Sequence, residues 1–232
     1  MTVALFPAAG RGKRMGAGKN KVLLNLAGEP LLLLTLRRFA ECKSVDFFIV
    51  IVGENEVEEI NHILSKEKTL PPYKVVIGGS ERQYSVENGI NALPSDADIV
   101  LVHDAARPFV SVETIEKVIS AAKNYGAAIA AVPAKNTVKF VENGIITATP
   151  PREKIWAATT PQGFRRDILT EAYKKAKADN FFGTDDASLV ERLKINVHIV
   201  EDSYDNFKIT TKSDFKIAEY IMVTSKNSKN IY

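Results

Sequence analysis

The chain opens with Val3-Ala4-Leu5-Phe6-Pro7-Ala8-Ala9-Gly10-Arg11-Gly12-Lys13-Arg14-Met15, an apolar run followed by a basic, glycine-bearing loop. The apolar run predicts a buried strand near 2–7 that delivers this loop to one edge of a sheet. Glycines leave backbone N–H groups open to a ligand, and Arg14, with Lys21 further on, supplies positive charge. The pattern indicates a loop that wraps nucleoside triphosphate phosphates. The alternative is an ordinary exposed basic loop between a strand and a helix.

The loop differs from the two better-known phosphate-binding motifs. A Walker loop has four residues between a glycine and Gly-Lys-Ser/Thr, and this chain has no such sequence. A dinucleotide fingerprint has a third glycine, which 10–15 lacks. Only Gly53-Glu54, after a strand expected near 46–52, would suit the ribose-binding acid of a dehydrogenase.

Length and composition are typical of one globular domain: 232 residues, 45% hydrophobic and 25% charged. A formal net charge of +3 gives no global field for recruiting nucleic acid or a membrane surface. The single cysteine, Cys42, cannot form an internal disulfide and suits a reducing compartment. The longest apolar stretch is far below the ~20 residues that cross a bilayer. We therefore expect a cytoplasmic protein without nucleic-acid or membrane partners.

Apolar runs alternate with helical patterns, which predicts an α/β fold: a Rossmann-like, mostly parallel twisted sheet with helices on both faces. We expect strands near 2–7, 46–52, 73–77, 97–102, 127–132 and 196–201. We expect helices near 30–42, 55–67, 81–92, 111–125 (with Ser111 as N-cap), 165–178 and 185–193, and a last helix from Ser213. A single domain over 1–225 accounts for these elements, followed by a polar tail over 226–232.

A hairpin interrupts this alternation. The alternating runs 137–141 and 145–149 flank Glu142-Asn143-Gly144, and Asn-Gly between such runs is a strong hairpin signal. A hairpin cannot continue a parallel sheet, so we expect a projecting β-arm over about 136–160. An isolated two-stranded ribbon is marginally stable, so a partner subunit is the natural place for it to dock, in a homodimer.

A second chemical cluster, His103-Asp104-Ala105-Ala106-Arg107-Pro108, follows the fourth expected strand. Ligands of open α/β sheets bind at the carboxyl ends of the strands. A carboxylate there can hold Mg²⁺ or another divalent cation between triphosphate oxygens, and Arg107 can contact a second phosphate. The alternative is an Asp–Arg surface pair that caps a turn.

At this point the chain resembles the 2-C-methyl-D-erythritol 4-phosphate cytidylyltransferases of the non-mevalonate isoprenoid pathway. The resemblance spans almost the whole chain and rests on several segments in order. These are Pro7-Ala8-Ala9-Gly10 with Arg14-Met15, Gly78-Gly79 with Glu81-Arg82 and Ser85-Val86, Val102 to Pro108, Pro151-Arg152 with Trp156, Thr160-Pro161-Gln162, Thr184-Asp185-Asp186-Ala187-Ser188, and Asn206-Phe207-Lys208-Ile209-Thr210. The resemblance implies a nucleotidyltransferase fold, a CTP and Mg²⁺ requirement, and a homodimer with interlocking arms.

The resemblance also implies roles for individual residues. The backbone of Ala8, Ala9 and Gly10, together with Gly79 and Ser85, would bind CTP. Arg14, Lys21 and Lys208 would be catalytic cations, and Asp104 would hold the metal. The polyol-phosphate acceptor would be bound by Arg107, Thr137, Arg152, Thr160 and Thr184, of which Thr137 and Arg152 would come from the partner's arm.

The chain departs from the family pattern in three places. It has Asn20-Lys21-Val22 where the family usually has Pro-Lys-Gln, which leaves open how the lysine loop is stiffened. Ser80 stands where many members carry an acid, which leaves the ribose contact open. Thr159 replaces a usual glutamine, with an open effect on the acceptor pocket.

The residues fit nucleotidyl transfer on chemical grounds as well. A phosphate acceptor is already an anion at neutral pH, so the reaction needs cations rather than a general base. The chain shows no Ser-His-Asp or Cys-His arrangement. Two alternatives stay open: a ribitol 5-phosphate cytidylyltransferase on the same scaffold, and a nucleotide-binding regulatory protein without catalysis.

Overall fold

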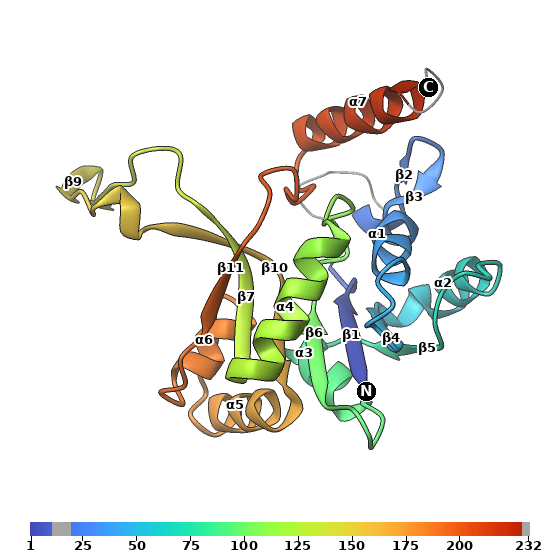
Figure 1. The fold of residues 1–232 in the computed structure, drawn as a ribbon, viewed down its shortest axis with the longest axis horizontal. Coiled ribbons are helices and arrows are strands. Elements are labelled where there is room, and N and C mark those ends of the chain that lie inside the picture. Colours follow the sequence, from blue (N-terminus) through green and yellow to red (C-terminus); the bar gives the residue numbers. More distant parts are fainter. Residues whose placement is uncertain (11–19, 229–232) are drawn as a thin grey trace.

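The structure is a computed structural model that describes residues 1–10 and 20–228, the last four of these by their backbone alone. A seven-stranded sheet runs through its centre in the order β11-β7-β10-β6-β1-β4-β5 (Figure 1). Its strands are β1 (Thr2–Pro7), β4 (Phe47–Val52), β5 (Tyr73–Ile77), β6 (Ile99–Val102), β7 (Ala127–Pro133), β10 (Trp156–Arg165) and β11 (His198–Glu201). The described chain contains no helix with the length and apolar character needed to cross a membrane.

Six helices cover the two faces of the sheet. They are α1 (Leu31–Ala40), α2 (Val57–Leu64), α3 (Arg82–Asn91), α4 (Val112–Tyr125), α5 (Arg166–Ala178) and α6 (Asp186–Glu191). Helices α1, α2 and α4 share one apolar core with the sheet, and α3, α5 and α6 share a second core on the other face (Figure 1). The expected α/β architecture with helices on both faces is confirmed.

The alternation of side chains along the strands explains the two cores. In β1, Ala4 and Phe6 point into the first core, whereas Val3 and Leu5 point into the second. A central strand buried on both faces therefore reads as a continuous apolar run. β1 pairs in parallel with β4 and with β6, as the pattern predicted.

One central strand was not expected. β10 pairs antiparallel with both β6 and β7, so the sheet is mostly but not wholly parallel. Its sequence, WAATTPQGFR, has neither a continuous apolar run nor a regular alternation of apolar and polar residues, and it contains Pro161. The pairing with β7 is irregular between Ala158 and Gln162, where a proline without an N–H can be accommodated.

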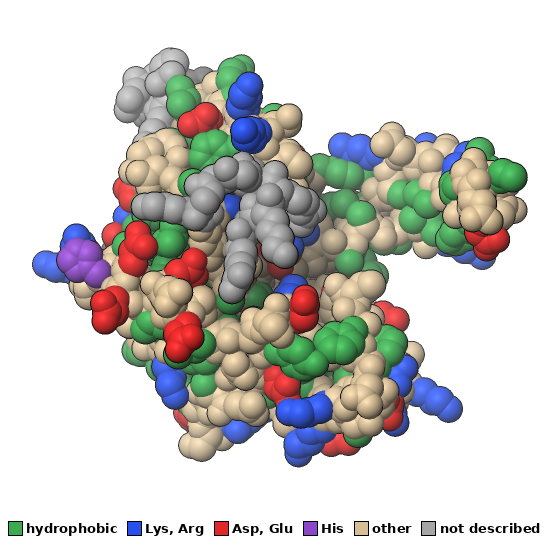
Figure 2. Space-filling view, turned by 180° about the vertical axis from the view of Figure 1, so that it is seen from behind, with side chains coloured by type: hydrophobic (Ala, Val, Ile, Leu, Met, Phe, Trp, Pro, Cys, Tyr) green, Lys and Arg blue, Asp and Glu red, His purple; other side chains and the backbone are tan. Residues whose placement is uncertain are grey.

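The expected hairpin is present as β8 (Phe140–Glu142) and β9 (Ile145–Ala148), joined at Asn143-Gly144. Both turn residues have positive φ, +50° and +80°, as the tightest hairpin turns require. The hairpin projects away from the body of the molecule, and green apolar side chains gather along it in Figure 2. The arm expected over about 136–160 is shorter as a separate ribbon, because residues 156–160 belong to β10 of the central sheet.

The remaining elements lie around one end of the sheet. β2 (Asn25–Leu26) and β3 (Glu29–Pro30) form a short hairpin beside α7 (Lys212–Ser228). The helix extends through the first residues of the expected tail, and 229–232 lie outside the described residues. Ser111 caps α4 as expected, since its Oγ accepts a hydrogen bond of 2.9 Å from the N–H of Thr114.

Candidate nucleotide-binding site

A cavity of about 930 Å³ lies at the carboxyl ends of β1, β4, β5 and β6. The segments that follow these strands supply most of its wall, and the chain near 208–210 closes it. Every described residue expected to bind CTP lines this cavity, namely Ala8, Ala9, Gly10, Gly79 and Ser85. Lys21, Asp104 and Lys208 also line it. The position agrees with the rule that ligands of open α/β sheets bind beyond the carboxyl ends of the strands.

The loops after β1 and β5 approach closely, and this approach requires glycine. A Cβ on Gly78 would lie 2.6 Å from the Cβ of Ala9 and 2.8 Å from Oγ of Ser85. Ser85 Oγ accepts a hydrogen bond of 3.1 Å from the Gly79 N–H and donates one of 3.0 Å to the Glu81 carbonyl. Ser85 therefore fixes the shape of the turn that forms one wall of the cavity.

Asn20 stiffens the segment that carries Lys21. Its Nδ2 donates hydrogen bonds to the carbonyl of Ala8, at 2.5 Å, and to Oε2 of Glu56, at 3.0 Å. Its Oδ1 accepts a hydrogen bond from the Val22 N–H and so caps the 3-10 helix Lys21–Leu23. The chain has Asn20 where the family usually has proline, and the hydrogen bonds of Asn20 stiffen the segment before Lys21. Lys21 Nζ in turn donates to the carbonyl of Ile209 at 3.0 Å.

Three cationic side chains surround Asp104. Its Oδ2 lies 2.9 Å from Nζ of Lys208 and 3.3 Å from Nε of Arg107, and its Oδ1 lies 3.6 Å from Nε of Arg82. Burial acts to raise the pKa of Asp104, but the three cations outweigh it and hold that pKa well below its usual range. Asp104 is therefore an anion at every physiological pH.

His103 and Thr160 fix the turn that carries Asp104. His103 Nε2 lies 3.1 Å from the Arg107 carbonyl, which can only accept, so this nitrogen carries the proton. Nδ1 is then the acceptor for the Thr160 hydroxyl at 3.0 Å, and Thr160 Oγ1 accepts from the Asp104 N–H at 3.1 Å. Burial lowers the pKa of His103 to about 3, and the imidazole stays neutral. Thr160 was expected to contact the acceptor. In the structure its hydroxyl is buried and hydrogen-bonded to His103 and to the backbone of Asp104.

A second buried network supports Arg107. Its Nη1 donates a hydrogen bond of 2.7 Å to the Asn206 carbonyl, and Asn206 Nδ2 donates to the Thr160 carbonyl and to Oδ2 of Asp202. Thr159 Oγ1 donates to the same Oδ2 at 2.6 Å. The departure at Thr159 therefore falls on a buried threonine that holds this network together.

Three other expected site residues, Thr137, Arg152 and Thr184, do not line the cavity. Thr137 and Arg152 lie in the exposed base of the arm, where Arg152 Nη1 donates to the Lys135 carbonyl at 3.3 Å. Thr184 is exposed in the loop before α6. Arg14 lies outside the described residues.

Sequence reasoning gave no role to Glu81 and Arg82, which line the cavity, and considered Glu54 only as the ribose-binding acid of a dehydrogenase. Arg82 is the first residue of α3. Ser80, which stands where many family members carry an acid, has no carboxylate, but Glu54 and Glu81 each place one at the cavity. Arg82 lies three residues after Gly79 and belongs to a segment that carries the family resemblance, so its charge could have been counted with the other cations. Glu54 follows the strand β4 as a ribose-binding acid would.

The described residues hold no cluster of three or more metal-ligating side chains. Asp104 places a carboxylate at the cavity. Proteins commonly hold Mg²⁺ with one or two carboxylates together with the phosphates of the substrate. The donor set therefore fits a divalent cation carried mainly by a triphosphate, for which Asp104 would be a protein ligand.

The sheet, the backbone-lined cavity at its carboxyl edge and the cations around Asp104 define a nucleotide-binding α/β protein. Comparison with known proteins narrows this class. The family model for 2-C-methyl-D-erythritol 4-phosphate cytidylyltransferase matches residues 2–224. The chain belongs to this family.

Curated relatives and solved structures agree with the assignment. The 2-C-methyl-D-erythritol 4-phosphate cytidylyltransferase of Bacillus cereus is 46% identical over 97% of this chain and 100% of that protein. The enzyme of Geotalea uraniireducens is 48% identical over 93% of this chain and 94% of that protein. The crystal structure of 4-diphosphocytidyl-2C-methyl-D-erythritol synthase from Anaerococcus prevotii superposes with a TM-score of 0.86, at 31% identity over 96% of both chains.

Proposed function

We propose that this protein transfers a cytidylyl group from CTP to 2-C-methyl-D-erythritol 4-phosphate, releasing pyrophosphate and forming 4-diphosphocytidyl-2-C-methyl-D-erythritol. The observation that carries the proposal is the cavity that places the backbone of 8–10, the Gly79–Ser85 turn, Lys21 and Lys208 around one space beside Asp104. The family membership of residues 2–224 supports the same activity and its isoprenoid product.

The reaction follows from charge. The acceptor phosphate oxygen attacks the α-phosphorus of CTP, a new P–O bond forms, and the bond to pyrophosphate breaks with its electrons staying on the leaving oxygen. Both reactants are polyanions, so the barrier falls when fixed cations hold them in line and neutralise charge that builds up on the oxygens. Lys21 and Lys208 line the cavity, Arg107 lies beside Asp104, and Arg14 completes the proposed set of cations.

No proton has to be abstracted from the acceptor. His103 supports this, because it is fully buried, both ring nitrogens are occupied, and its low pKa keeps it neutral. It holds the backbone of Asp104 and Arg107 instead. A divalent cation, which we propose to be Mg²⁺, would be held by Asp104 and would draw charge from the triphosphate oxygens.

We further propose that the enzyme is a homodimer in which the arm of one subunit completes the other's site. On the arm, Phe140, Val141, Ile145 and Ile146 are each more than half exposed, and a partner surface would cover them. Arg152 and Thr137, at the base of the arm, would then reach the acceptor in the neighbouring cavity. The lone, buried Cys42 fits a cytoplasmic location.

The acceptor is decided by one experiment. Pyrophosphate release from CTP is measured with 2-C-methyl-D-erythritol 4-phosphate, with ribitol 5-phosphate and without acceptor. The proposal expects the methylerythritol phosphate to give a kcat/KM at least about tenfold higher, since one well-placed methyl group in a pocket is worth about 1–3 kcal/mol. A preference for ribitol 5-phosphate would identify the alternative enzyme, and no release with either would contradict the activity.

A further inference from the structure

A buried carboxylate lies directly behind the cavity. Asp186, the first residue of α6, is completely buried. Its Oδ1 accepts a hydrogen bond from the hydroxyl of Tyr173, on α5, at 2.5 Å, and its Oδ2 accepts one from Nη2 of Arg82 at 2.7 Å. Taking a carboxylate out of water is costly unless it is paired and hydrogen-bonded. Both oxygens of Asp186 meet that requirement.

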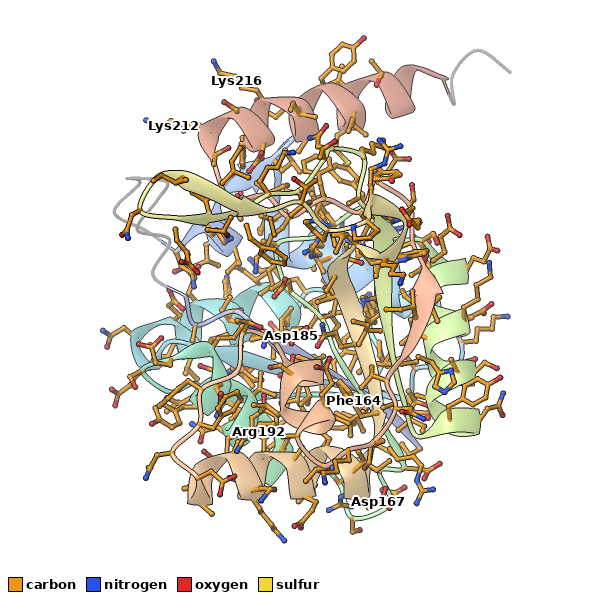
Figure 3. The ribbon with its side chains drawn as sticks, turned by 90° about the vertical axis from the view of Figure 1, so that its left-hand side faces the viewer. Phe164, Asp167, Asp185, Arg192, Lys212 and Lys216 are labelled. Carbon is orange, nitrogen blue, oxygen red and sulfur yellow. The ribbon has the colours of Figure 1, made fainter. Side chains whose placement is uncertain are left out.

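The backbone of Asp186 is held as firmly as its side chain. Gln162, on β10, is 1% exposed, and its Oε1 accepts hydrogen bonds from the N–H groups of Asp186 and Ala187, at 3.1 and 3.0 Å. Its Nε2 donates to Oδ2 of Asp185 at 2.8 Å. Figure 3 shows Asp185 at the start of α6 beside the strand that carries Phe164. A central strand thus anchors the first turn of α6.

Arg82 extends from this anchor toward the site. Its side chain is one-third exposed and lines the cavity, and its Nε lies 3.6 Å from Oδ1 of Asp104. The bond to Asp186 uses one of the five guanidinium N–H groups, so others are left to meet a ligand. An arginine fixed at one end is preorganised, and a planar guanidinium suits phosphate oxygens.

We propose that Arg82 binds a substrate phosphate at the end of the cavity next to Asp104, and that Asp186, held by Gln162 and Tyr173, is the residue that positions it. The inference rests on the proposed function, which supplies the phosphates. It gives the Thr160-Pro161-Gln162 and Thr184-Asp185-Asp186 segments a shared role. Gln162, on the central strand, fixes the position of Asp186, and Asp186 in turn fixes the side chain of Arg82 in the cavity.

The test measures kcat, both KM values and the melting temperature for Arg82→Gln, Asp186→Asn and the double variant. Arg82→Gln is expected to lower kcat/KM about a hundredfold, as for loss of one cationic contact, and Asp186→Asn about tenfold. If Asp186 acts through Arg82, the double variant stays within about threefold of Arg82→Gln, because the two effects do not multiply. Tyr173→Phe, which keeps the ring, lowers kcat/KM in the same direction by a smaller factor.

Arg37→Gln is the matched control. Arg37, on α1, pairs with Glu67 at 2.9 Å and does not line the cavity, so its loss lowers stability and leaves kcat/KM unchanged. An Asp186→Asn variant that lowers the melting temperature but leaves kcat and both KM values within threefold of the parent would overturn the inference. Effects that multiply in the double variant would overturn it too.

The inference and the proposed function fail in different ways. A parent protein without transfer activity contradicts the proposed function. Calorimetric titration with CTP and with the polyol phosphate then decides the inference separately. Weaker binding of either ligand to Arg82→Gln and Asp186→Asn, with unchanged binding to Arg37→Gln, supports it, and equal binding to all variants, or to none including the parent, overturns it.

Discussion

Nζ of Lys208 lies 2.9 Å from Oδ2 of Asp104, and both side chains face the same cavity. Lys208 comes from the segment before α7, whereas Asp104 lies in the loop that follows the central strand β6. The carboxylate therefore holds in place a cation that the proposed transfer reaction would use. Arg107 and Arg82 approach the same carboxylate. A site ordered in this way needs little reorganisation when phosphates arrive.

The first prediction concerns Asp104→Asn. The amide keeps the shape but removes the charge that orders Lys208 and Arg107 and that would hold the divalent cation. We expect kcat to fall about a hundredfold or more and the Mg²⁺ concentration for half-maximal activity to rise. Steady-state rates over a Mg²⁺ titration measure both. Unchanged Mg²⁺ dependence alongside reduced kcat would show that Asp104 orders cations without holding the metal.

The second prediction concerns Lys21→Ala. We expect turnover to fall about a hundredfold, because the charge that Lys21 meets is largest in the transition state, while the affinity for CTP changes little. Stopped assays give kcat, and calorimetry gives the CTP affinity. Lys21→Arg is the control for charge. Turnover within threefold of the parent would assign Lys21 a structural role, which its hydrogen bond to the Ile209 carbonyl would explain.

Most of the fold could be predicted because its strands are buried on both faces and read as apolar runs. β1 and β4 were located to within a residue for this reason. β10 was missed because its sequence has no continuous apolar run or regular alternation and because Pro161 interrupts it, so tertiary pairing rather than local preference makes it a strand. The same oversight extended the expected arm into the central sheet.

The lining of the cavity could be predicted where a single loop supplies it, as at 8–10, Gly78-Gly79 and Asp104. What could not be predicted is which polar residues support the loops from behind. Asn20 and Thr160 are buried, and their side chains form hydrogen bonds with other groups of the protein. Arg82 pairs with Asp186, which lies 104 positions further along the chain, and no local sequence pattern records this contact.

The third prediction is a pH dependence of stability that comes from His103. Its pKa is about 3 in the folded protein, below the value of about 6.5 for an exposed histidine. Between these values the unfolded chain binds the proton and the folded protein does not. The free energy of unfolding therefore falls as the pH drops below about 6.5, by up to about 1.4 kcal/mol per pH unit from this residue.

Urea unfolding of the metal-free protein at several pH values between 4.5 and 7.5 measures this slope. His103→Gln keeps hydrogen-bonding groups but cannot titrate in this range, so its slope should be shallower than the parent's. His62→Gln is the control, since His62 is exposed on α2, and its slope should match the parent's. Equal slopes for the parent and His103→Gln would contradict the neutral, buried state of His103.

The fourth prediction concerns the arm. Arg152→Ala and Lys21→Ala are each expected to be inactive alone, because each removes a cation from every site. If the arms cross, a mixed dimer collects both defects in one site and none in the other. Statistical pairing gives about half mixed dimers, so mixing should restore up to about a quarter of parental activity per total site. Native mass spectrometry checks subunit exchange. No recovery despite exchange would place Arg152 in its own subunit's site.

Labelled CTP distinguishes cytidylyl transfer from other phosphoryl transfers, because it shows which phosphorus reacts. With CTP labelled at the α-phosphorus, 2-C-methyl-D-erythritol 4-phosphate and Mg²⁺, we expect the label to enter the cytidylyl product. With CTP labelled at the γ-phosphorus, we expect all released label to be pyrophosphate. Label passing from the γ-phosphorus to the acceptor, or no labelled product from the α-phosphorus, would contradict cytidylyl transfer in this cavity.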